Sequence, residues 1–264
     1  MKDFSTLEDS SLAGKFEIDR TDEEGRLYSL LKKIETIEPF FVRRIPLWKR
    51  TLDILGSFFG LIILSPLFLA MAVFIKIVSP GPVFFKQTRI GYGAKEFNFW
   101  KFRTMKVNAD TSCHQAHLCE LINEEEEDCE ESEKPMTKLD QDNPNIIRFG
   151  HFLRSSCLDE LPQLINVLTG DMSLVGPRPP IPYEVEQYLI WHKNRFDGLP
   201  GMTGLWQVSG KNRLTFKEMI RLDIQYERQM SLLTDIKILL MTPFAILNEY
   251  RCSRRGTERR YEDA

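Results

Sequence analysis

The sequence predicts a mostly helical α+β fold that is attached to a membrane, and three observations predict it. Residues 54–75 form an apolar stretch without a charged residue. Residues 96–105, EFNFWKFRTM, alternate apolar and polar side chains as a β-strand does. Residues 161–168 carry leucine and isoleucine at the spacing of an amphipathic helix. A membrane helix, a short β-hairpin and amphipathic helices at the membrane surface are therefore expected.

Composition divides the chain of 264 residues into three parts. Residues 1–45 are polar, contain no apolar run able to cross a membrane, and predict an N-terminal extension. Residues 46–250 predict the principal domain, with an acidic insertion at 108–145 that we expect to be solvated. Residues 251–264 predict a basic C-terminal tail.

The charge and the cysteines indicate which partners and which compartment to expect. A net charge of -3 and a pI near 5.9 give no reason to expect nucleic-acid binding. Residues 1–40 are charged, so no signal peptide is expected. The five cysteines are an odd number, which is typical of reduced thiols on the cytosolic side of a membrane.

The apolar stretch 54–75 is long enough to cross a membrane, because a spanning helix needs about 20 apolar residues. Ser65 and Pro66 lie at its middle, where proline removes a backbone hydrogen bond and kinks a helix. Basic residues flank both ends, which favours both ends in the cytoplasm. A re-entrant helix that breaks at Ser65-Pro66 fits these features. A kinked spanning helix, with residues 1–48 outside, fits them equally well.

A β-hairpin is expected directly after this stretch. Pro80-Gly81-Pro82 and Gly91-Tyr92-Gly93 are turn signals on either side of an apolar segment. The alternating residues 96–105 then supply the second strand.

The helix predicted over 161–168 places two carboxylates at its start. Pro162 is tolerated only in the first helical turn, so the helix is expected to begin near Asp159 and Glu160. That position favours negative charge and also receives phosphate oxygens. One carboxylate is then able to attack phosphorus while the other holds Mg²⁺. The alternative is that the pair only caps its helix.

Cations gather in the sequence around this carboxylate pair. Arg154 lies just upstream of the pair, and Lys101 and Arg103 lie in the predicted strand. Arg178 is held between two prolines, which presents its guanidinium with little conformational freedom left to lose. Arginine suits bidentate phosphate contacts, so we expect a diphosphate site. The alternative for each residue is a solvated surface cation.

Near the C-terminus, residues 235–247 are apolar but too short to cross a membrane, and arginines follow them. A helix lying at the membrane surface beside anionic lipids fits both features. A core helix with a solvated basic tail is the alternative.

Four strings, in this order, give the chain a resemblance that covers residues 46–247. They are KRTLDILGSFFGLIILSPL, FFKQTRIGYGAKEFNFWKFRTM, FGHFLRSSCLDELPQLINVLTGDMSLVGPRP and PGMTGLWQVSGKN. The sequence resembles the bacterial sugar transferases, or monotopic phosphoglycosyl transferases, which start capsule, exopolysaccharide and O-antigen assembly.

This resemblance implies an enzyme that transfers a hexose-1-phosphate from a UDP-sugar to undecaprenyl phosphate. It implies a monotopic protein of the bacterial inner membrane, with a re-entrant helix broken at Ser65-Pro66 and an active site on the cytoplasmic face. It also implies a ping-pong reaction with Asp159 as nucleophile and Glu160 beside Mg²⁺. The candidates for binding phosphate and the UDP-sugar are Lys101, Arg103, Arg154, Arg178 and Asp223.

Three departures from the family's pattern are visible. Cys157 stands where serine or threonine is usual, Lys211 stands where arginine is expected, and the insertion at 108–145 is unusually long. Two other functions remain open at this point: a nucleotide-sugar phosphohydrolase that uses water as acceptor, and a non-catalytic scaffold of polysaccharide assembly. Glucose and galactose are favoured as the sugar by family likeness, and the residues leave open whether the chain forms a homo-oligomer.

Overall fold

The computed structural model describes residues 44–107 and 143–262. Every described residue belongs to one compact unit of the chain, residues 43–264. Most of the predicted N-terminal extension, 1–45, and most of the acidic insertion, 108–145, lie outside the described residues.

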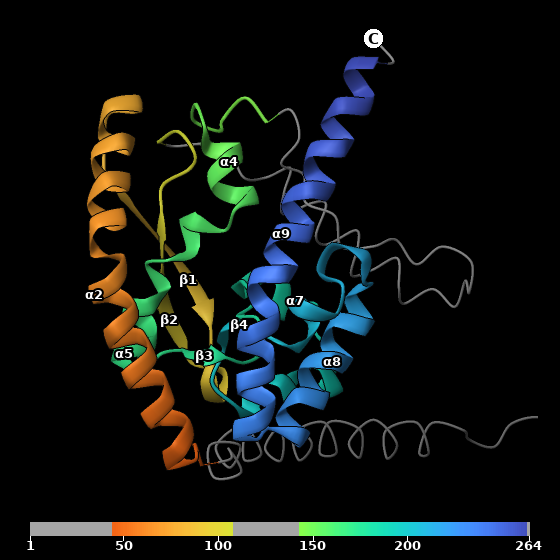
Figure 1. The fold of residues 1–264 in the computed structure, drawn as a ribbon. Helices are drawn as coiled ribbons and strands as arrows, with labels where there is room; N and C mark the ends of the chain where they lie inside the picture. Colours follow the sequence, from red (N-terminus) through yellow and green to blue (C-terminus); the bar gives the residue numbers. More distant parts are fainter. Residues whose placement is uncertain (1–43, 108–142, 263–264) are drawn as a thin grey trace, which may run out of the picture. The chain divides into compact units, whose positions relative to one another are not determined.

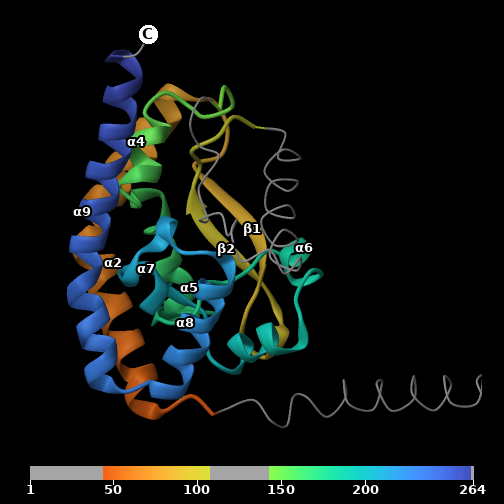
Figure 2. The same ribbon diagram turned by 90° about the vertical axis from the view of Figure 1, so that its right-hand side faces the viewer.

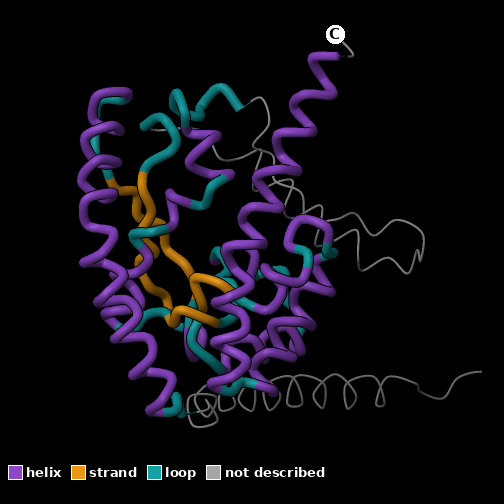
Figure 3. The backbone as a smooth tube through the Cα atoms, viewed as in Figure 1, coloured by secondary structure: helices purple, strands orange, loops and turns teal. Residues whose placement is uncertain are grey.

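Helices predominate in the described unit, as the sequence predicts, and the strands form two small sheets (Figures 1 and 3). The α-helices and strands, in chain order, are α2 (Leu47–Val78), β1 (Phe84–Ile90), β2 (Glu96–Phe102), α4 (Gly150–Ser155), α5 (Gln163–Thr169), β3 (Ser173–Val175), α6 (Pro182–Val185), β4 (Gly201–Thr203), α7 (Leu205–Ser209), α8 (Phe216–Gln229) and α9 (Leu232–Glu262). Short 3₁₀ helices are η2 (Tyr92–Ala94), η3 (Leu158–Glu160), η4 (Ile190–Asp197) and η5 (Lys211–Arg213).

The predicted hairpin is confirmed. β1 and β2 pair antiparallel from Phe84 opposite Phe102 to Ile90 opposite Glu96, and the 3₁₀ helix η2 joins them. The second sheet is a short parallel pair, in which Ser173 of β3 faces Gly201 of β4. β3 lies against α2 and α9, so this small sheet joins the two long helices to the rest of the unit.

Among the described residues, α2 is the one helix that is long and apolar enough to cross a membrane. It continues as a helix through Pro66 and changes direction near its middle (Figure 1). Pro66 has no N–H to donate to the carbonyl of Ile62, one turn back, and the Ser65 hydroxyl donates to that carbonyl instead at 2.8 Å. The Ser-Pro pair therefore bends the helix without leaving this carbonyl unpaired.

One face of α2 packs on the unit and the other is exposed. Its C-terminal half supplies Met71 and Ile75 to a buried cluster with Phe102 and Leu153. The exposed large apolar residues of α2 are Leu47, Ile54, Leu55, Phe58, Phe59, Ile62, Ile63, Leu69, Val73 and Ile77. Such a contiguous apolar surface marks a membrane or protein contact, so α2 is compatible with a membrane-associated helix.

Buried polar residues fix the N-terminal half of α2 on the unit. The Lys49 ammonium is 2% exposed and donates to Asp235 Oδ2 of α9 and to the Tyr226 hydroxyl of α8, both at 2.8 Å. One turn further on, Asp53 Oδ1 accepts from the Ser173 hydroxyl at 2.8 Å. A buried charge is tolerated only when it is paired, so these contacts set which face of α2 turns inward.

Replacing Lys49 by methionine is expected to destabilise the unit by about 3–5 kcal/mol, because Asp235 would keep a buried negative charge without its partner. The midpoint of thermal unfolding of the detergent-purified protein measures this loss. Lys76→Met is the matched control, since Lys76 is exposed in the last turn of the same helix. Equal unfolding midpoints for Lys49→Met and the control would contradict the anchoring role.

Candidate active site

The two predicted catalytic carboxylates lie on the 3₁₀ helix η3, between α4 and α5. α5 itself begins at Gln163, with Pro162 at its N-cap, so the α-helix starts later than the sequence predicts. The reason is that Pro162 cannot donate a hydrogen bond, and the chain before it is held by bonds between residues three apart, such as Glu160 N to Cys157 O at 3.2 Å.

Asp159 and Glu160 point to different surroundings, as neighbours on a helical turn do. Asp159 is 5% exposed, whereas the Glu160 side chain is about a third exposed. Glu160 Oε1 accepts a charge-assisted hydrogen bond from Lys101 Nζ at 2.7 Å. The hairpin strand β2 thus brings one predicted cation directly to one predicted carboxylate, across 59 residues of sequence.

Arg178 and Asp223 belong to a buried network joined by Arg195. Arg195 Nη2 donates to the Arg178 carbonyl at 2.7 Å and pairs with Asp223 of α8. Arg178 Nη1 lies 3.4 Å from Glu184 Oε2, and Glu184 is fully buried in α6. Burial opposes the charge of Glu184, but Arg178 and Arg195 outweigh it and lower the pKa of this carboxyl below its usual value. Burial raises the pKa of Asp223 to about 6, even though Arg195 pairs with it.

Arg89 lies near Arg178 and Glu184 and also near Glu160, and it is not among the residues predicted from the sequence to bind phosphate. It is 7% exposed at the end of β1, where its Nη1 donates to the Pro179 carbonyl at 2.9 Å. Burial and the neighbouring Arg178 lower the pKa of Arg89 to about 9, while Glu184 and Glu160 act in the opposite direction. Its strand sequence, QTRIG, carries no signal that separates it from a solvated cation.

Two of the departures from the family's pattern contact each other. Lys211 Nζ lies 3.6 Å from Cys157 Sγ and also pairs with Glu249 of α9. Burial opposes the charge of Lys211, but Cys157, Glu249 and Glu160 outweigh it and raise the pKa of this lysine. Lys211 therefore adds a cation near Glu160 and ties the carboxylate turn to α9.

Arg103 and Arg154 contact the segments that flank the hairpin. Arg103 is 4% exposed, and its guanidinium donates to the carbonyls of Ser79 and Pro80, directly after α2. It therefore fixes the segment that follows α2, and its predicted contact with phosphate stays a prediction. Arg154 of α4 lies with Nη1 3.5 Å from Thr104 Oγ1, next to β2.

The carboxylates do not line the cavity of about 630 Å³ found in the described unit, which lies between η4 and α8. Cations of three segments gather near Glu160 instead. Lys101 of the hairpin contacts it, Arg89 of the hairpin and Lys211 of η5 lie near enough for its charge to affect their pKa, and Arg178 from the loop after β3 lies near Arg89. Such a group of cations around two carboxylates suits a doubly charged diphosphate.

His192, beside the arginine network, makes the unit sensitive to acid. It is 4% exposed, its Nδ1 accepts from the Leu189 N–H, and burial with Arg195 and Lys217 nearby lowers its pKa to about 4. A histidine whose pKa is depressed in the folded state costs stability as pH falls from its unfolded pKa of about 6.5 to the folded value.

The unit is therefore expected to lose on the order of 3 kcal/mol between pH 6.5 and pH 4 through His192 alone. His192→Asn keeps an acceptor for Leu189 but does not titrate. The difference in unfolding midpoint between this variant and the wild type should therefore be constant above about pH 6.5, and below it the wild type should lose stability relative to the variant. A gap independent of pH would show that His192 is not the titrating group.

The matches to known proteins cover the residues of this candidate site. The family described as bacterial sugar transferase matches residues 44–249. The galactosyl transferase CpsE of Streptococcus agalactiae is 42% identical over 200 residues, which cover 75% of this chain and 42% of that protein. The exopolysaccharide production protein ExoY of Sinorhizobium fredii is 37% identical over 209 residues, which cover 79% of this chain and 87% of that protein.

A third relative is the UDP-glucose:undecaprenyl-phosphate glucose-1-phosphate transferase of Escherichia coli, 37% identical over 210 residues, which cover 75% of this chain and 40% of that protein. The chain thus spans about two fifths of the length of CpsE and of the Escherichia coli enzyme, and most of the length of ExoY. The match includes the hairpin, both carboxylates and α8. The chain belongs to the bacterial sugar transferase family.

Proposed function

We propose that this protein transfers a hexose-1-phosphate from a UDP-sugar to undecaprenyl phosphate, releasing UMP. The observation that carries the proposal is the meeting of Lys101 with Glu160, beside the buried Asp159 and among the arginines of the hairpin and the loop after β3. The names of the relatives, which include glucose-1-phosphate and galactose phosphotransferases acting on undecaprenyl phosphate, support the same reaction. UDP-glucose and UDP-galactose are the favoured donors.

The first half of the reaction is an attack on the donor. A carboxylate oxygen of Asp159 forms a bond to the phosphorus that carries the sugar, and the bond from this phosphorus to the bridging oxygen breaks. UMP leaves with that oxygen, and an acyl phosphate carrying the sugar remains on Asp159. Arg89 and Arg178 bind the diphosphate and stabilise the negative charge that develops on the leaving group.

The second half regenerates the carboxylate. A phosphate oxygen of undecaprenyl phosphate attacks the same phosphorus, and the bond to Asp159 breaks. The product is undecaprenyl diphosphate sugar, the first lipid-linked intermediate of exopolysaccharide, capsule or O-antigen assembly. Lys101 and Glu160 are both partly exposed where they meet, which supports a role for Lys101 in binding the incoming phosphate.

Mg²⁺ fits this site as an ion shared with the donor. Among the described residues there is no group of three metal-ligating side chains, but Mg²⁺ in phosphate chemistry is usually held by one or two carboxylates together with phosphate oxygens. Glu160, with or without Asp159, would supply the carboxylate oxygens, and its Oε1 also accepts from Lys101. Mg²⁺ bound there would neutralise charge on the diphosphate.

The membrane surface of the protein is proposed to include both long helices. α9 exposes Leu233, Ile236, Leu240 and Phe244, in addition to the exposed apolar face of α2. Figure 2 shows both helices on one side of the described unit, with the hairpin on the other. We propose that this side enters the cytoplasmic leaflet of the inner membrane, with both ends of α2 in the cytoplasm and the bend at Pro66 at its deepest point.

The experiment that tests the function measures UMP release and lipid-linked sugar in the same reaction. The detergent-purified protein is incubated with Mg²⁺ and radiolabelled UDP-glucose or UDP-galactose, with and without undecaprenyl phosphate. Transfer predicts that, beyond one UMP per enzyme from the first half of the reaction, UMP and labelled lipid form in equal amounts and only when the lipid is present. UMP with free hexose phosphate, and without lipid, would identify a phosphohydrolase. No turnover of any donor would favour the scaffold.

A further inference from the structure

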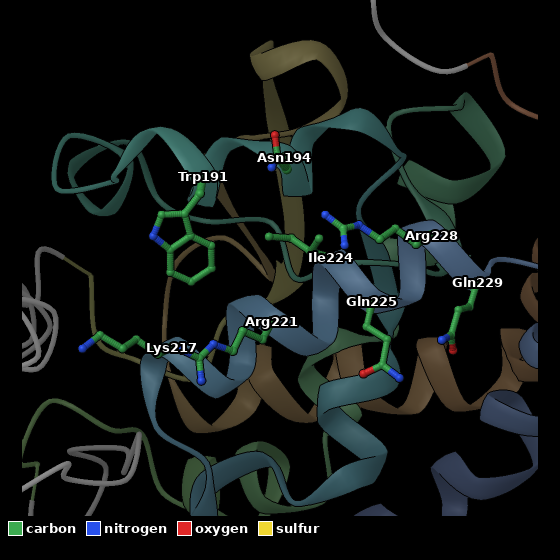
Figure 4. Close-up of a pocket in the computed structure, with 8 residues that line it drawn as sticks. All are labelled: Trp191, Asn194, Lys217, Arg221, Ile224, Gln225, Arg228 and Gln229. Carbon is green, nitrogen blue, oxygen red and sulfur yellow. The ribbon is translucent and has the colours of Figure 1, made fainter. Parts of the chain in front are cut away.

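A basic cavity lies on the face of α8 opposite to the one that carries Asp223. It has a volume of about 630 Å³ and lies between α8 and η4 (Figure 4). Its cations are Lys217, Arg221 and Arg228, and no carboxylate lines it. Because the residues of α8 that line it recur every three to four positions, they form one stripe along the helix.

The cavity is separate from the transfer site, although α8 serves both. Asp223 is buried and pairs with Arg195 on the inner face of α8. Arg221 lies two residues earlier and is exposed, and two residues correspond to a rotation of about 200° around a helix. A ligand in the cavity therefore meets the opposite face of α8 from the one that carries the arginine network.

The spacing of the cations indicates an extended ligand. Lys217 and Arg228 are eleven residues apart, which is about 16 Å along a helix axis. A single phosphate cannot contact both ends of this stripe, whereas about five residues of extended peptide span the same length. The ligand must therefore carry several negative charges in a row.

The rest of the lining favours a peptide. Trp191 of η4 and Ile224 of α8 are half-buried beside the cations and offer an apolar contact to one side chain (Figure 4). Side-chain amides such as that of Gln225 donate and accept hydrogen bonds together, as a peptide backbone does. A lipid surface is instead matched by the exposed apolar residues of α2 and α9.

We propose that this cavity binds an acidic peptide segment of a partner protein, one that carries glutamate or aspartate residues around an apolar residue. Long-range attraction between the cationic stripe and the acidic segment would steer the encounter, and Trp191 with Ile224 would hold the apolar residue. The cavity then anchors the enzyme to a cytoplasmic component, and binding there does not depend on the transfer reaction.

The test uses the full-length protein in detergent and a short fluorescein-labelled peptide of alternating glutamate and leucine, followed by fluorescence anisotropy. Arg221→Glu combined with Arg228→Glu is expected to weaken binding by roughly tenfold or more at low salt, because the variant repels the peptide. Lys193→Glu is the matched control, since Lys193 is exposed on η4 but does not line the cavity. It should change the affinity by no more than about twofold.

Sugar transfer by the double variant should equal that of the wild type, which separates this inference from the proposed reaction. Equal peptide affinity of the double variant and the wild type would overturn the proposal. Displacement of the peptide by a UDP-sugar would assign the cavity to the donor and would also overturn it. Binding of phosphatidylglycerol vesicles, lost in the double variant, with no binding of the peptide, would assign the cavity to lipid instead.

Discussion

Replacing Asp159 by asparagine is expected to lower the rate of sugar transfer by at least about 10³-fold, because asparagine has no carboxylate to attack phosphorus. The exchange is nearly isosteric, and Asp159 is buried on a short 3₁₀ turn, so the fold should be retained. Initial rates of UMP formation with undecaprenyl phosphate and Mg²⁺ measure the effect.

The control for this variant is Asp197→Asn, which makes the same chemical change at an exposed position in η4. It should transfer sugar at close to the wild-type rate. The preparation of Asp159→Asn must contain no wild-type enzyme. If it then kept more than a tenth of the wild-type activity, Asp159 would be a helix-capping residue and another residue would be the nucleophile.

The contact between Lys101 and Glu160 gives the second large effect. Lys101→Met and Glu160→Gln are each expected to lower transfer by roughly 10²-fold, because each removes one charge that meets the diphosphate or the acceptor phosphate. The double variant should lose no more than about tenfold beyond the weaker single variant, since residues that act as a unit are strongly non-additive.

Lys86→Met is the matched control for the lysine. Lys86 lies on the neighbouring strand β1 with its ammonium 4.2 Å from the centre of the Trp100 ring, and it is exposed. Near-wild-type transfer by this variant would show that the loss in Lys101→Met is specific to that lysine and does not follow from removing any cation of the hairpin. Fully additive losses in the double variant would mean that Lys101 and Glu160 act separately, and would contradict the paired role.

Local sequence patterns were sufficient to predict the elements whose residues alternate or are uniformly apolar. The alternation of 96–105 predicted β2, and the uncharged stretch 54–75 predicted the apolar part of α2. The extent of α9 was not predictable in this way. It runs to Glu262, past the boundary expected at residue 251, because a helix continues wherever the chain does not break it, whether or not its residues are apolar.

The candidate site was predictable where its residues stand in dense motifs and not where they are assembled by tertiary packing. Asp159, Glu160, Lys101 and Arg178 were predicted from the sequence, and Lys101 meets Glu160 as expected for one site. The place of Arg89 follows only from the pairing of the hairpin with the loop after β3, at Ile90 N to Pro180 O. No spacing of residues in the sequence predicts such a contact.

The same limit applies to two of the three departures from the family's pattern. Cys157 and Lys211 are 54 residues apart, and each looks like an independent substitution in the sequence. Their contact shows that they form one local environment beside Glu160, in which a cysteine meets a flexible lysine in place of the expected hydroxyl and planar guanidinium.

The measurement that tests the covalent role of Asp159 most directly is the intact mass of the protein after incubation with Mg²⁺ and either UDP-glucose or UDP-galactose, without acceptor lipid. A ping-pong mechanism predicts that the wild type gains the mass of one hexose phosphate with its true donor, and that Asp159→Asn gains none. Release of UMP on adding undecaprenyl phosphate, with no adduct from any donor on the wild type, would contradict it and mean that the sugar phosphate passes directly to the lipid.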